Sequence, residues 1–340
     1  MFDPSIYKHR SKYTTPTISP ESNIQHHFDS DLLDAFWWYA KKRMEIWHQK
    51  NAGLAWPRTD DSILQTYKFC NAYRELDKQT IYIHKKLAHL RDNFPLWLCN
   101  LMMFRFIAKI ETFESLWIYD YRMSSPPSRE AGAEIQTRFP PIDPRRNRQS
   151  GDDIQREWHT EISKKYEDKL RSLLSPKFGD AYLFPPQVPQ TLGYHDRYDF
   201  ICQYLPKISW ELAGLLETFD DLSVSDALSL VLQKLNIWLK FHFTEILIDV
   251  AYQYPELINL NGKFWIWPGS RPTMKRFDAK KTPEEVCLLL IQTQPQNFPY
   301  LEIDGKQMPI TAEWIEWLWC EFRKYSNLKL WGGKKRVYRG

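Results

Sequence analysis

Apolar residues recur every three or four positions along most of this chain, which is the period of an amphipathic helix. The longest such pattern runs from about Ser30 to Gly53, where Ser30 or Asp31 is a suitable N-cap and Gly53 a suitable stop. Its apolar positions are Leu33, Phe36, Trp37, Ala40, Met44 and Trp47. The charged positions, mostly on the opposite and normally solvated face, are Lys41, Lys42, Arg43 and Lys50. Together with the segments below, this pattern predicts a mainly all-α fold.

Further helices and one hairpin follow from the same kind of pattern. Helices are predicted for residues 94–121 (two core helices meeting near 110–112), 152–174, 198–219 (broken near 206), 225–254, 283–292 and 311–325. Thr282 and Glu285 have the spacing of a capping box before the helix that starts at Pro283. Asp304-Gly305 predicts the tight turn of a small β-hairpin between residues 301 and 310.

Stretches without a helical period divide the chain. Residues 1–27 are polar and predict an extended or disordered arm. Residues 123–151 and 175–190 are rich in proline and predict long surface loops. We therefore expect a single large helical domain over residues 28–340, with Pro-rich insertions and at most a small β-hairpin.

The stretch from Trp56 to Asp77 has an unusual polar content, and we expect it to be helical. Asp60 and Asp61 suit a helix N-terminus, because carboxylates there cap free N–H groups and oppose the helix dipole. On a helical period one face holds Ile63, Tyr67, Cys70 and Arg74, with Asn71 at its edge and Asp77 beside Arg74. Buried polar groups need partners. Two interpretations are open: a structural ion pair of Arg74 with Asp77, or a polar pocket.

A second polar feature lies inside the predicted helix at residues 225–254. Glu245 and Asp249 are four residues apart in a run that is apolar around nearly its whole circumference, so this helix should be central. Burial and mutual repulsion raise the pKa of paired carboxylates, which suits general acid–base catalysis. The alternative is that they balance core arginines such as Arg74 or Arg105. Arg105 itself is either such a paired arginine or a phosphate contact, and nearby His242 is more typical of a hydrogen-bonded core residue.

Basic residues gather at three other places. The turn at Gly269 is followed by Arg271, Lys275 and Arg276, a combination that suits phosphate binding. The Pro-rich stretch carries Arg145, Arg146 and Arg148, and the C-terminal tail carries Lys334, Lys335, Arg336 and Arg339 around Tyr338. Basic residues interleaved with aromatic ones suit a nucleic-acid strand, although charge runs are usually only solvated.

Composition excludes several classes of function. The net charge of +4 permits a nucleic-acid partner without requiring one. The 5 cysteines are scattered, so neither a zinc site nor a disulfide framework is indicated, and no metal or other cofactor is expected. No GxxxxGK[ST] motif occurs. No signal peptide and no apolar run of membrane-spanning length are visible, so we expect a cytoplasmic or nuclear, non-secreted protein without a membrane partner.

Residues 56–77, WPRTDDSILQTYKFCNAYRELD, resemble the opening signature of a helical family of DNA base-hypermodification proteins. These are the alpha-glutamyl/putrescinyl thymine pyrophosphorylases and the related helical domain of 5-hydroxymethyluracil DNA kinases. Later patches resemble the family in the same order, from Phe36 to Tyr338 overall. In these patches, the residues that match the motif positions of the family are Arg105, Thr112, Glu245, Asp249, Gly269, Arg271, Arg276, Cys320, Glu321, Lys324 and Tyr325. The chain departs from the family pattern at Ser62, Cys70, Thr244, Trp267, Thr273 and Arg323.

The resemblance implies an all-helical fold akin to helix-hairpin-helix DNA glycosylases. It implies that pyrophosphate on a 5-hydroxymethylated thymine in DNA is displaced by the amine of an amino acid or polyamine. The expected catalytic residues are Asp249 or Glu245, to take the proton of the amine, and Arg271, to hold pyrophosphate. The expected substrate- and DNA-binding residues are Arg58, Tyr67, Lys68, Asn71, Tyr73, Arg74, Asp77, Arg105, Gly269, Arg276, Lys324, Lys334, Lys335 and Arg336, with Trp56 as a further stacking residue. The implied partners are DNA, the amine and a companion kinase.

Two alternatives stay open. One is a non-catalytic DNA-binding or adaptor domain of the same family, and the other is a glycosylase-like enzyme that acts on a modified base. The carboxylates distinguish catalysis from binding. If Glu245, Asp249 and Arg271 converge on an open pocket, catalysis is favoured, whereas carboxylates sealed into ion pairs favour binding.

Overall fold

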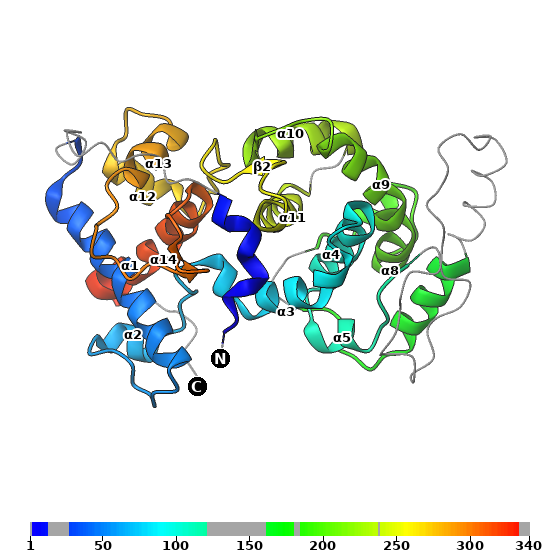
Figure 1. Ribbon diagram of the computed structural model, residues 1–340, viewed down its shortest axis with the longest axis horizontal. Helices are drawn as coiled ribbons and strands as arrows, with labels where there is room; N and C mark the ends of the chain where they lie inside the picture. The colour runs from blue at the N-terminus through cyan, green and yellow to red at the C-terminus, as the bar shows by residue number, and fades with distance from the viewer. Residues whose placement is uncertain (1, 13–26, 121–160, 180–183, 237–238, 333–340) are drawn as a thin grey trace. The chain divides into compact units, whose positions relative to one another are not determined.

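The computed structural model describes residues 2–12, 27–120, 161–179, 184–236, 239–332, and these are mainly helical (Figure 1). The mainly all-α prediction is therefore confirmed, and within these ranges the strands are four segments of two residues each. The chain divides into two units, which we describe separately. Unit 1 comprises residues 1–85 and 219–340, and unit 2 comprises residues 86–218.

Unit 1 contains the elements that build the candidate site. In chain order these are η1 (Pro4–Lys12), α1 (Ser30–Asn51), α2 (Ser62–Thr66), η3 (Arg74–Leu76), α3 (Lys78–Leu87, which ends in unit 2), β1 (Leu222–Ser223), α10 (Val224–Leu235), α11 (Lys240–Gln253), β2 (Ile258–Asn259), α12 (Arg271–Phe277), α13 (Pro283–Ile291), β3 (Glu302–Ile303), β4 (Lys306–Gln307) and α14 (Ala312–Trp331).

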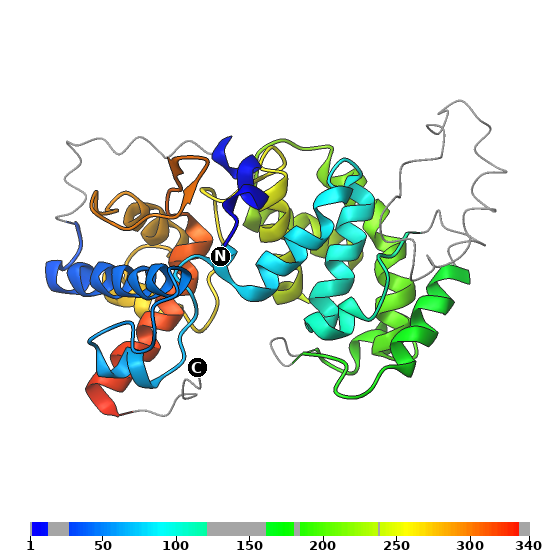
Figure 2. The ribbon, with the colours of Figure 1, turned by 60° about the horizontal axis from the view of Figure 1, so that its bottom comes forward.

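An aromatic core joins α1 to the C-terminal helices of unit 1. Helix α1 starts at its N-cap Asp29, whose side chain accepts a hydrogen bond from the Leu32 amide. Its apolar face packs on α14, and the two helices lie side by side in both views (Figures 1 and 2). Phe36 meets Phe322 edge to face, with ring centroids 5.6 Å apart. Trp37 stacks on Trp314 at 6.2 Å. Such aromatic pairs add stability beyond that of apolar burial, so the packing of α1 on α14 is well stabilised.

Helix α11 is the central helix of the other part of unit 1, as predicted. Every side chain from His242 to Gln253 is buried. Helix α10 packs along it, and the predicted single helix at residues 225–254 is therefore two helices. The break follows Asn236, which has a left-handed backbone (φ 49°). Leu222 and Ser223 pair in parallel with Ile258 and Asn259.

Unit 2 is built around a helix that is buried on all sides. This central helix is α4 (Phe94–Ile107). The other elements of unit 2 are η4 (Ala88–Leu90), α5 (Ile110–Glu114), a helix at 161–172, α7 (Val188–Thr191), α8 (Arg197–Asp199), the π-helical turn η5 (Phe200–Tyr204) and α9 (Leu205–Leu216). Helix α4 ends at Ala108, whose φ of 54° lets the chain turn into α5. Helix α9 packs along α4 in both views (Figures 1 and 2).

Two short features match the sequence prediction closely, and one differs. Thr282 and Glu285 form the predicted capping box of α13. Strands β3 and β4 pair in antiparallel register around Asp304-Gly305, as predicted for the hairpin. In the predicted N-terminal arm, by contrast, residues 4–12 are helical and Tyr7 is fully buried. Tyr7 donates a hydrogen bond to the Glu75 carbonyl at 3.0 Å, and this contact orders a segment whose own sequence has no helical period.

Candidate functional site

The signature segment, which we define as Trp56–Asp77, forms one wall of a cavity of about 820 Å³ in unit 1, here called the signature cavity. This volume lies within the range of ligand sites. The predicted binding residues that line it are Arg58, Tyr67, Lys68, Asn71, Tyr73, Arg74 and Asp77. Other segments contribute Arg43, Trp47, Lys50, Lys78 and Trp317. The signature residues named from the sequence thus lie around one cavity.

The signature segment is not the predicted long helix. Asp61 caps the short helix α2, which ends at Thr66, and Tyr67 has extended backbone angles (φ −109°, ψ 146°). From there to Tyr73 the backbone is held by side chains of other helices. The Arg43 guanidinium donates to the carbonyls of Phe69 and Cys70 at 2.9–3.1 Å, and the Glu321 carboxylate accepts from the Cys70 amide at 3.2 Å. These bonds replace the ladder of a helix and keep the segment open beside the cavity.

Arg43 corrects a second expectation. Its position on the charged face of α1 indicated a solvated side chain, but only 7% of it is exposed. A buried guanidinium needs several acceptors. The carbonyls of the signature segment supply them. Arg43 is therefore a structural clamp on this segment, which a helical pattern alone does not indicate.

The charge of the signature cavity is strongly one-sided. Lys50, Lys68 and Lys78 are exposed and Arg58 is half-buried, and none of these four forms an ion pair with another described residue. Among the described residues that line the cavity, Asp77 is the single carboxylate. Unpaired cations on one concave wall favour an anionic ligand such as phosphate.

Aromatic side chains stand beside these cations. The Arg58 guanidinium lies 5.8 Å from the ring centroid of Trp56, and its Nε donates to the Leu54 carbonyl at 2.7 Å. Tyr73 is buried and fixed by its hydroxyl, which donates to the Met308 carbonyl at 3.0 Å. Tyr67 is half-buried. Trp56 and Tyr67 can therefore present ring faces to a planar base, whereas Tyr73 shapes the wall.

Arg74 and Asp77 do not act together as the sequence suggested. The Arg74 guanidinium forms an ion pair with Glu245 of α11, and both side chains are about 95% buried. Asp77 caps α3, where its Oδ1 accepts from the amides of Gln79 and Thr80 at 2.9 and 3.4 Å. The alternative in which Glu245 balances Arg74 is thus the one observed.

Asp249 is sealed in the same way. Its Oδ1 lies 3.1 Å from Nε2 of His84, and neither side chain is exposed to solvent. His84 was missed in the sequence because the amphipathic pattern of α3 gives no sign that one of its positions meets a carboxylate 165 residues away. The rings of Tyr7 and Tyr252 both make T-shaped contacts with the imidazole, at centroid distances of 5.3 and 6.0 Å. Both predicted catalytic carboxylates therefore lie in buried pairs.

The predicted phosphate turn before α12 uses its own backbone groups. The amides of Ser270 and Arg271 donate to the Trp267 carbonyl at 3.0 and 3.2 Å. Glu316 of α14 accepts from the Trp267 amide at 3.2 Å and from the Ser270 hydroxyl at 2.6 Å. Burial raises the pKa of Glu316 to about 7, although the two hydrogen bonds oppose this shift. Arg271 is exposed and is absent from the lining of the signature cavity.

The other predicted binding residues lie elsewhere. Gly269 contacts α14, where an added Cβ would come within 3.0 Å of the Cys320 sulfur. Arg276 is exposed on α12, and Lys324 forms an ion pair with Glu321 at 2.6 Å. Arg105 is buried in unit 2 with 2% exposure. Outside the described residues lie the predicted basic positions Arg145, Arg146, Arg148, Lys334, Lys335, Arg336 and Arg339.

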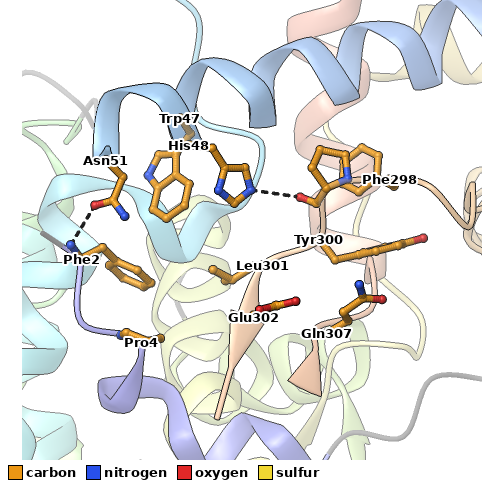
Figure 3. Close-up of a pocket in the computed structure, with 11 residues that line it drawn as sticks. Phe2, Pro4, Trp47, His48, Asn51, Phe298, Tyr300, Leu301, Glu302 and Gln307 are labelled. Carbon is orange, nitrogen blue, oxygen red and sulfur yellow. Dashed lines mark hydrogen bonds between the residues drawn. The ribbon is translucent and has the colours of Figure 1, made fainter. Parts of the chain in front are cut away.

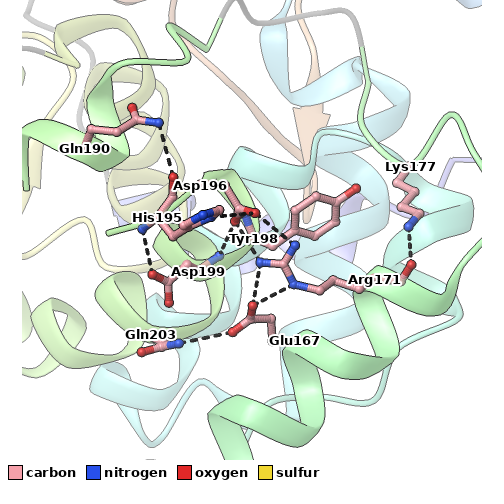
Figure 4. Close-up of polar contacts among 9 residues, drawn as sticks. All are labelled: Glu167, Arg171, Lys177, Gln190, His195, Asp196, Tyr198, Asp199 and Gln203. Carbon is pink, nitrogen blue, oxygen red and sulfur yellow. Dashed lines mark hydrogen bonds and ion pairs between the residues drawn. The ribbon is translucent and has the colours of Figure 1, made fainter. Parts of the chain in front are cut away.

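Unit 2 carries a polar network of its own, shown in Figure 4. Arg171 forms ion pairs with Glu167 at 2.6 Å and with Asp196 at 2.9 Å. Its guanidinium lies over the ring of Tyr198, 4.5 Å from the centroid. Asp196 also caps α8 by accepting from the amides of residues 198 and 199. Because these charges satisfy one another, the network ties the 161–172 helix to α8 and is structural.

The described residues contain neither a metal-binding cluster nor a membrane-spanning helix. No group of three or more His, Cys, Asp or Glu side chains in this part of the chain is placed to hold a metal ion. None of the helices resolved here combines the length and the apolar character needed to cross a membrane.

Comparison with known proteins gives one region of similarity. Residues 30–124 match the family described as "5-hmdU DNA kinase, helical domain". A 5-hmdU DNA kinase of Bacillus phage SP10 is 30% identical over 107 residues, which cover 29% of this chain and 17% of that protein. No solved structure matches significantly. The resemblance noted from the signature is therefore confirmed for residues 30–124, which contain the signature segment and are similar to the helical domain of 5-hmdU DNA kinases.

Proposed function

We propose that this chain acts in the hypermodification of thymine in DNA, and that its signature cavity binds a 5-hydroxymethyluracil-derived base. The observation that carries the proposal is the convergence of unpaired cations and aromatic rings on one cavity, built by the segment that resembles the 5-hmdU DNA kinase helical domain. Cations neutralise phosphate, and ring faces stack on bases.

The size of the cavity supports an extruded base. A base inside a duplex is out of reach of a concave pocket, so proteins that act on single bases flip them out of the stack. Trp56 and Tyr67 line the cavity, and in this proposal their rings stack on the flipped base. Lys68 and Arg58 also line the cavity, and in this proposal they bind the phosphates that flank the base. The helix-hairpin-helix, glycosylase-like arrangement that the resemblance implies is part of this proposal, because that class of fold handles flipped bases.

Binding to duplex oligonucleotides tests the proposal. The duplexes would carry one thymine, one 5-hydroxymethyluracil or one 5-phosphoryloxymethyluracil, and fluorescence anisotropy would give each affinity at several salt concentrations. Lys68→Gln should weaken binding and lower the salt dependence by roughly one counterion. The matched control is Lys280→Gln, which removes an exposed lysine outside the cavity. Equal effects of the two changes would contradict a role for the signature cavity.

Selectivity for the base is tested separately. Tyr67→Leu should reduce affinity for the modified duplex by roughly 1–3 kcal/mol, the usual contribution of one stacked base. It should affect the unmodified duplex less, because an intact base pair stays in the helix. Loss of the preference for modified DNA in this variant supports a stacked, flipped base, whereas an unchanged preference argues against it.

A second candidate function is transfer of an amine to the same base, the reaction that the resemblance implies. The amine nitrogen would form a bond to the 5-methylene carbon as the bond from that carbon to the pyrophosphate oxygen breaks. Pyrophosphate would leave with the electron pair, held by cavity cations, and the ammonium proton would pass to a carboxylate. The observation in favour is Asp77, the one carboxylate that the described part of the chain contributes to the cavity wall. Asp249 and Glu245 would instead hold the structure around the site.

Nucleoside analysis by mass spectrometry tests the transfer. DNA bearing 5-pyrophosphoryloxymethyluracil would be incubated with the chain, amino acids and polyamines. An aminated thymine that disappears with Asp77→Asn, but not with the exposed control Asp220→Asn, supports the enzyme. DNA that is bound but chemically unchanged would leave the binding module as the function.

A further inference from the structure

A second cavity of about 500 Å³ lies in unit 1 between α1 and the segment around the β3–β4 hairpin (Figure 3). We call it the aromatic cavity. It shares Phe2, Trp47 and Asn51 with the signature cavity, so the two are neighbours with a common wall. Phe2 is held in this wall because its amide donates to Oδ1 of Asn51 at 2.9 Å and its ring meets Trp47 edge to face at 5.5 Å.

The two cavities differ in charge. Neither arginine nor lysine lines the aromatic cavity, whose lining residues are all described, and Glu302 is its one carboxylate. His48 is the one lining side chain that can become a cation. Its Nε2 lies 3.4 Å from the Pro299 carbonyl, and donation to this carbonyl leaves Nδ1 as a hydrogen-bond acceptor. The aromatic cavity therefore lacks the cluster of fixed cations that marks the signature cavity as a phosphate site.

The polar groups of the aromatic cavity are suited to the edge of a base. Glu302 pairs across the hairpin with Gln307, so both side chains project from the same face of the two strands (Figure 3). Glu302 is exposed and forms no ion pair with another described residue, so its carboxylate can accept hydrogen bonds from a ligand. Gln307 can donate and accept, and Asn51, whose Oδ1 already accepts from Phe2, still has Nδ2 to donate. Carboxylates and side-chain amides are the groups with which proteins recognise base edges.

Ring faces complete the site. Trp47 of α1 and Tyr300 of the hairpin segment both line the cavity (Figure 3). Tyr300 is fixed by its hydroxyl, which donates to the Pro295 carbonyl at 2.9 Å. Aromatic rings of this kind stack on nucleobases. A flat, uncharged group with donors and acceptors along its edge is therefore the ligand that this combination fits.

Glu302 also selects among the bases. A carboxylate accepts hydrogen bonds and donates none, so it favours a base whose edge carries an exocyclic amino group, as adenine, cytosine and guanine do. Thymine presents carbonyl oxygens on both sides of its ring N–H, and these oxygens are repelled by a carboxylate. The aromatic cavity thus disfavours thymine.

We propose that the aromatic cavity binds a second, unpaired base that carries an exocyclic amino group, on the strand whose modified thymine occupies the signature cavity. Its edge meets Glu302 and Gln307, and its face meets Tyr300. The phosphates of the strand stay on the other side of the common wall, where Lys50 lines the signature cavity next to Asn51. The assignment to a DNA strand rests on the proposed function, whereas recognition of the base itself does not.

Titration of the full chain with nucleosides, without DNA and followed by ligand-observed NMR, tests the site. Deoxyadenosine and deoxycytidine should bind roughly fivefold more tightly than thymidine, or more, as expected for one selective base contact. Glu302→Gln should reduce this preference to less than about twofold, because an amide donates to carbonyl oxygens as well as accepting from amino groups. The matched control is Asp304→Asn, which removes a carboxylate at the tip of the same hairpin, outside the cavity, and should leave the preference unchanged.

Variants of Tyr300 and His48 separate stacking from selection. Tyr300→Leu should weaken binding of all three nucleosides roughly fivefold without changing their order, whereas Tyr300→Phe keeps the ring face and should keep the affinity. His48→Gln should keep the preference. Equal affinities for deoxyadenosine and thymidine would overturn the proposal. So would a preference that His48→Gln abolishes and Glu302→Gln retains, because the imidazole would then select the base.

Single-stranded oligonucleotides test the assignment to DNA, since they present two unpaired bases without the cost of opening a pair. Each would carry one 5-hydroxymethyluracil or thymine beside adenine, cytosine or thymine. Adenine or cytosine as the neighbour should raise affinity roughly fivefold over thymine, and Glu302→Gln should remove this effect while keeping the preference for the modified base. Selective nucleoside binding without an effect of the neighbour would overturn the strand assignment and indicate a free nucleoside as the ligand. An effect of the neighbour without a preference for 5-hydroxymethyluracil would support this site and refute the proposed function.

Discussion

The buried ion pair of Arg74 with Glu245 gives a test of whether Glu245 is structural or catalytic. Both side chains are about 95% buried. Removing one partner of such a pair leaves a buried charge uncompensated, at a cost of roughly 3–5 kcal/mol. That is a large part of the 5–15 kcal/mol or so by which a domain is stable. We therefore expect Glu245→Gln to lower the free energy of unfolding of unit 1 by about 3 kcal/mol, toward the low end because the amide still accepts a hydrogen bond from Arg74.

Urea unfolding followed by tryptophan fluorescence measures this effect. The double variant Arg74→Met/Glu245→Leu should recover most of the loss, since replacing both members of a buried pair by apolar residues is often neutral. Glu217→Gln serves as the exposed control and should change stability by less than about 0.5 kcal/mol. The reasoning is refuted if Glu245→Gln unfolds like wild type. If that stable variant also abolished amination of DNA, Glu245 would be a catalytic residue rather than a structural one.

Three further changes probe the fold and the site. Burial raises the pKa of Glu316 from its usual 4.5 to about 7, so between these pH values the native state holds a proton that the unfolded state has lost. The free energy of unfolding should therefore fall by about 3 kcal/mol as pH rises through this window, and Glu316→Gln should flatten that part of the profile in unfolding experiments from pH 5 to 8. Gly179→Ala should destabilise unit 2 by about 2 kcal/mol or more in thermal unfolding, because its Cβ would lie 1.9 Å from the Ala108 carbonyl oxygen, whereas Gly214→Ala has open space and should not. Asp61→Ala removes the cap of α2 and the 2.7 Å hydrogen bond from the Tyr325 hydroxyl, and should cost about 1–2 kcal/mol in urea unfolding while weakening DNA binding.

Local patterns predicted the elements that depend on local contacts. The capping box at Thr282 and Glu285 and the hairpin turn at Asp304-Gly305 are formed as expected, because both are specified within a few residues. The apolar circumference of α11 also predicted its full burial, and with it the burial of Glu245 and Asp249. The period of the apolar residues thus predicts which faces of a helix are buried in the folded chain.

Partners that lie far apart in the sequence could not be predicted in this way. His84 gives no local sign of its contact with Asp249, and Arg74 had a plausible local partner in Asp77 but pairs with Glu245. The prediction of a long helix over the signature segment was wrong for a related reason. Its composition is compatible with a helix, but Arg43 offers its backbone carbonyls a tertiary alternative to the helical ladder. Tertiary hydrogen bonds therefore override local propensity where the site is built.

The distribution of charge separates the residues that hold the site from those available to a ligand. The buried charges Arg43, Arg74 and Asp249 all face protein partners, as expected when an uncompensated buried charge costs several kcal/mol. Lys68 and Lys78, in contrast, line the signature cavity without an ion pair among the described residues. Like charges that share a concave wall repel each other in the free chain. A bound anion removes this repulsion, and this relief adds to the free energy of binding. The same residues are thus costly without a ligand and favourable with one, which is why affinity for DNA should fall steeply with salt while the buried pairs remain unaffected.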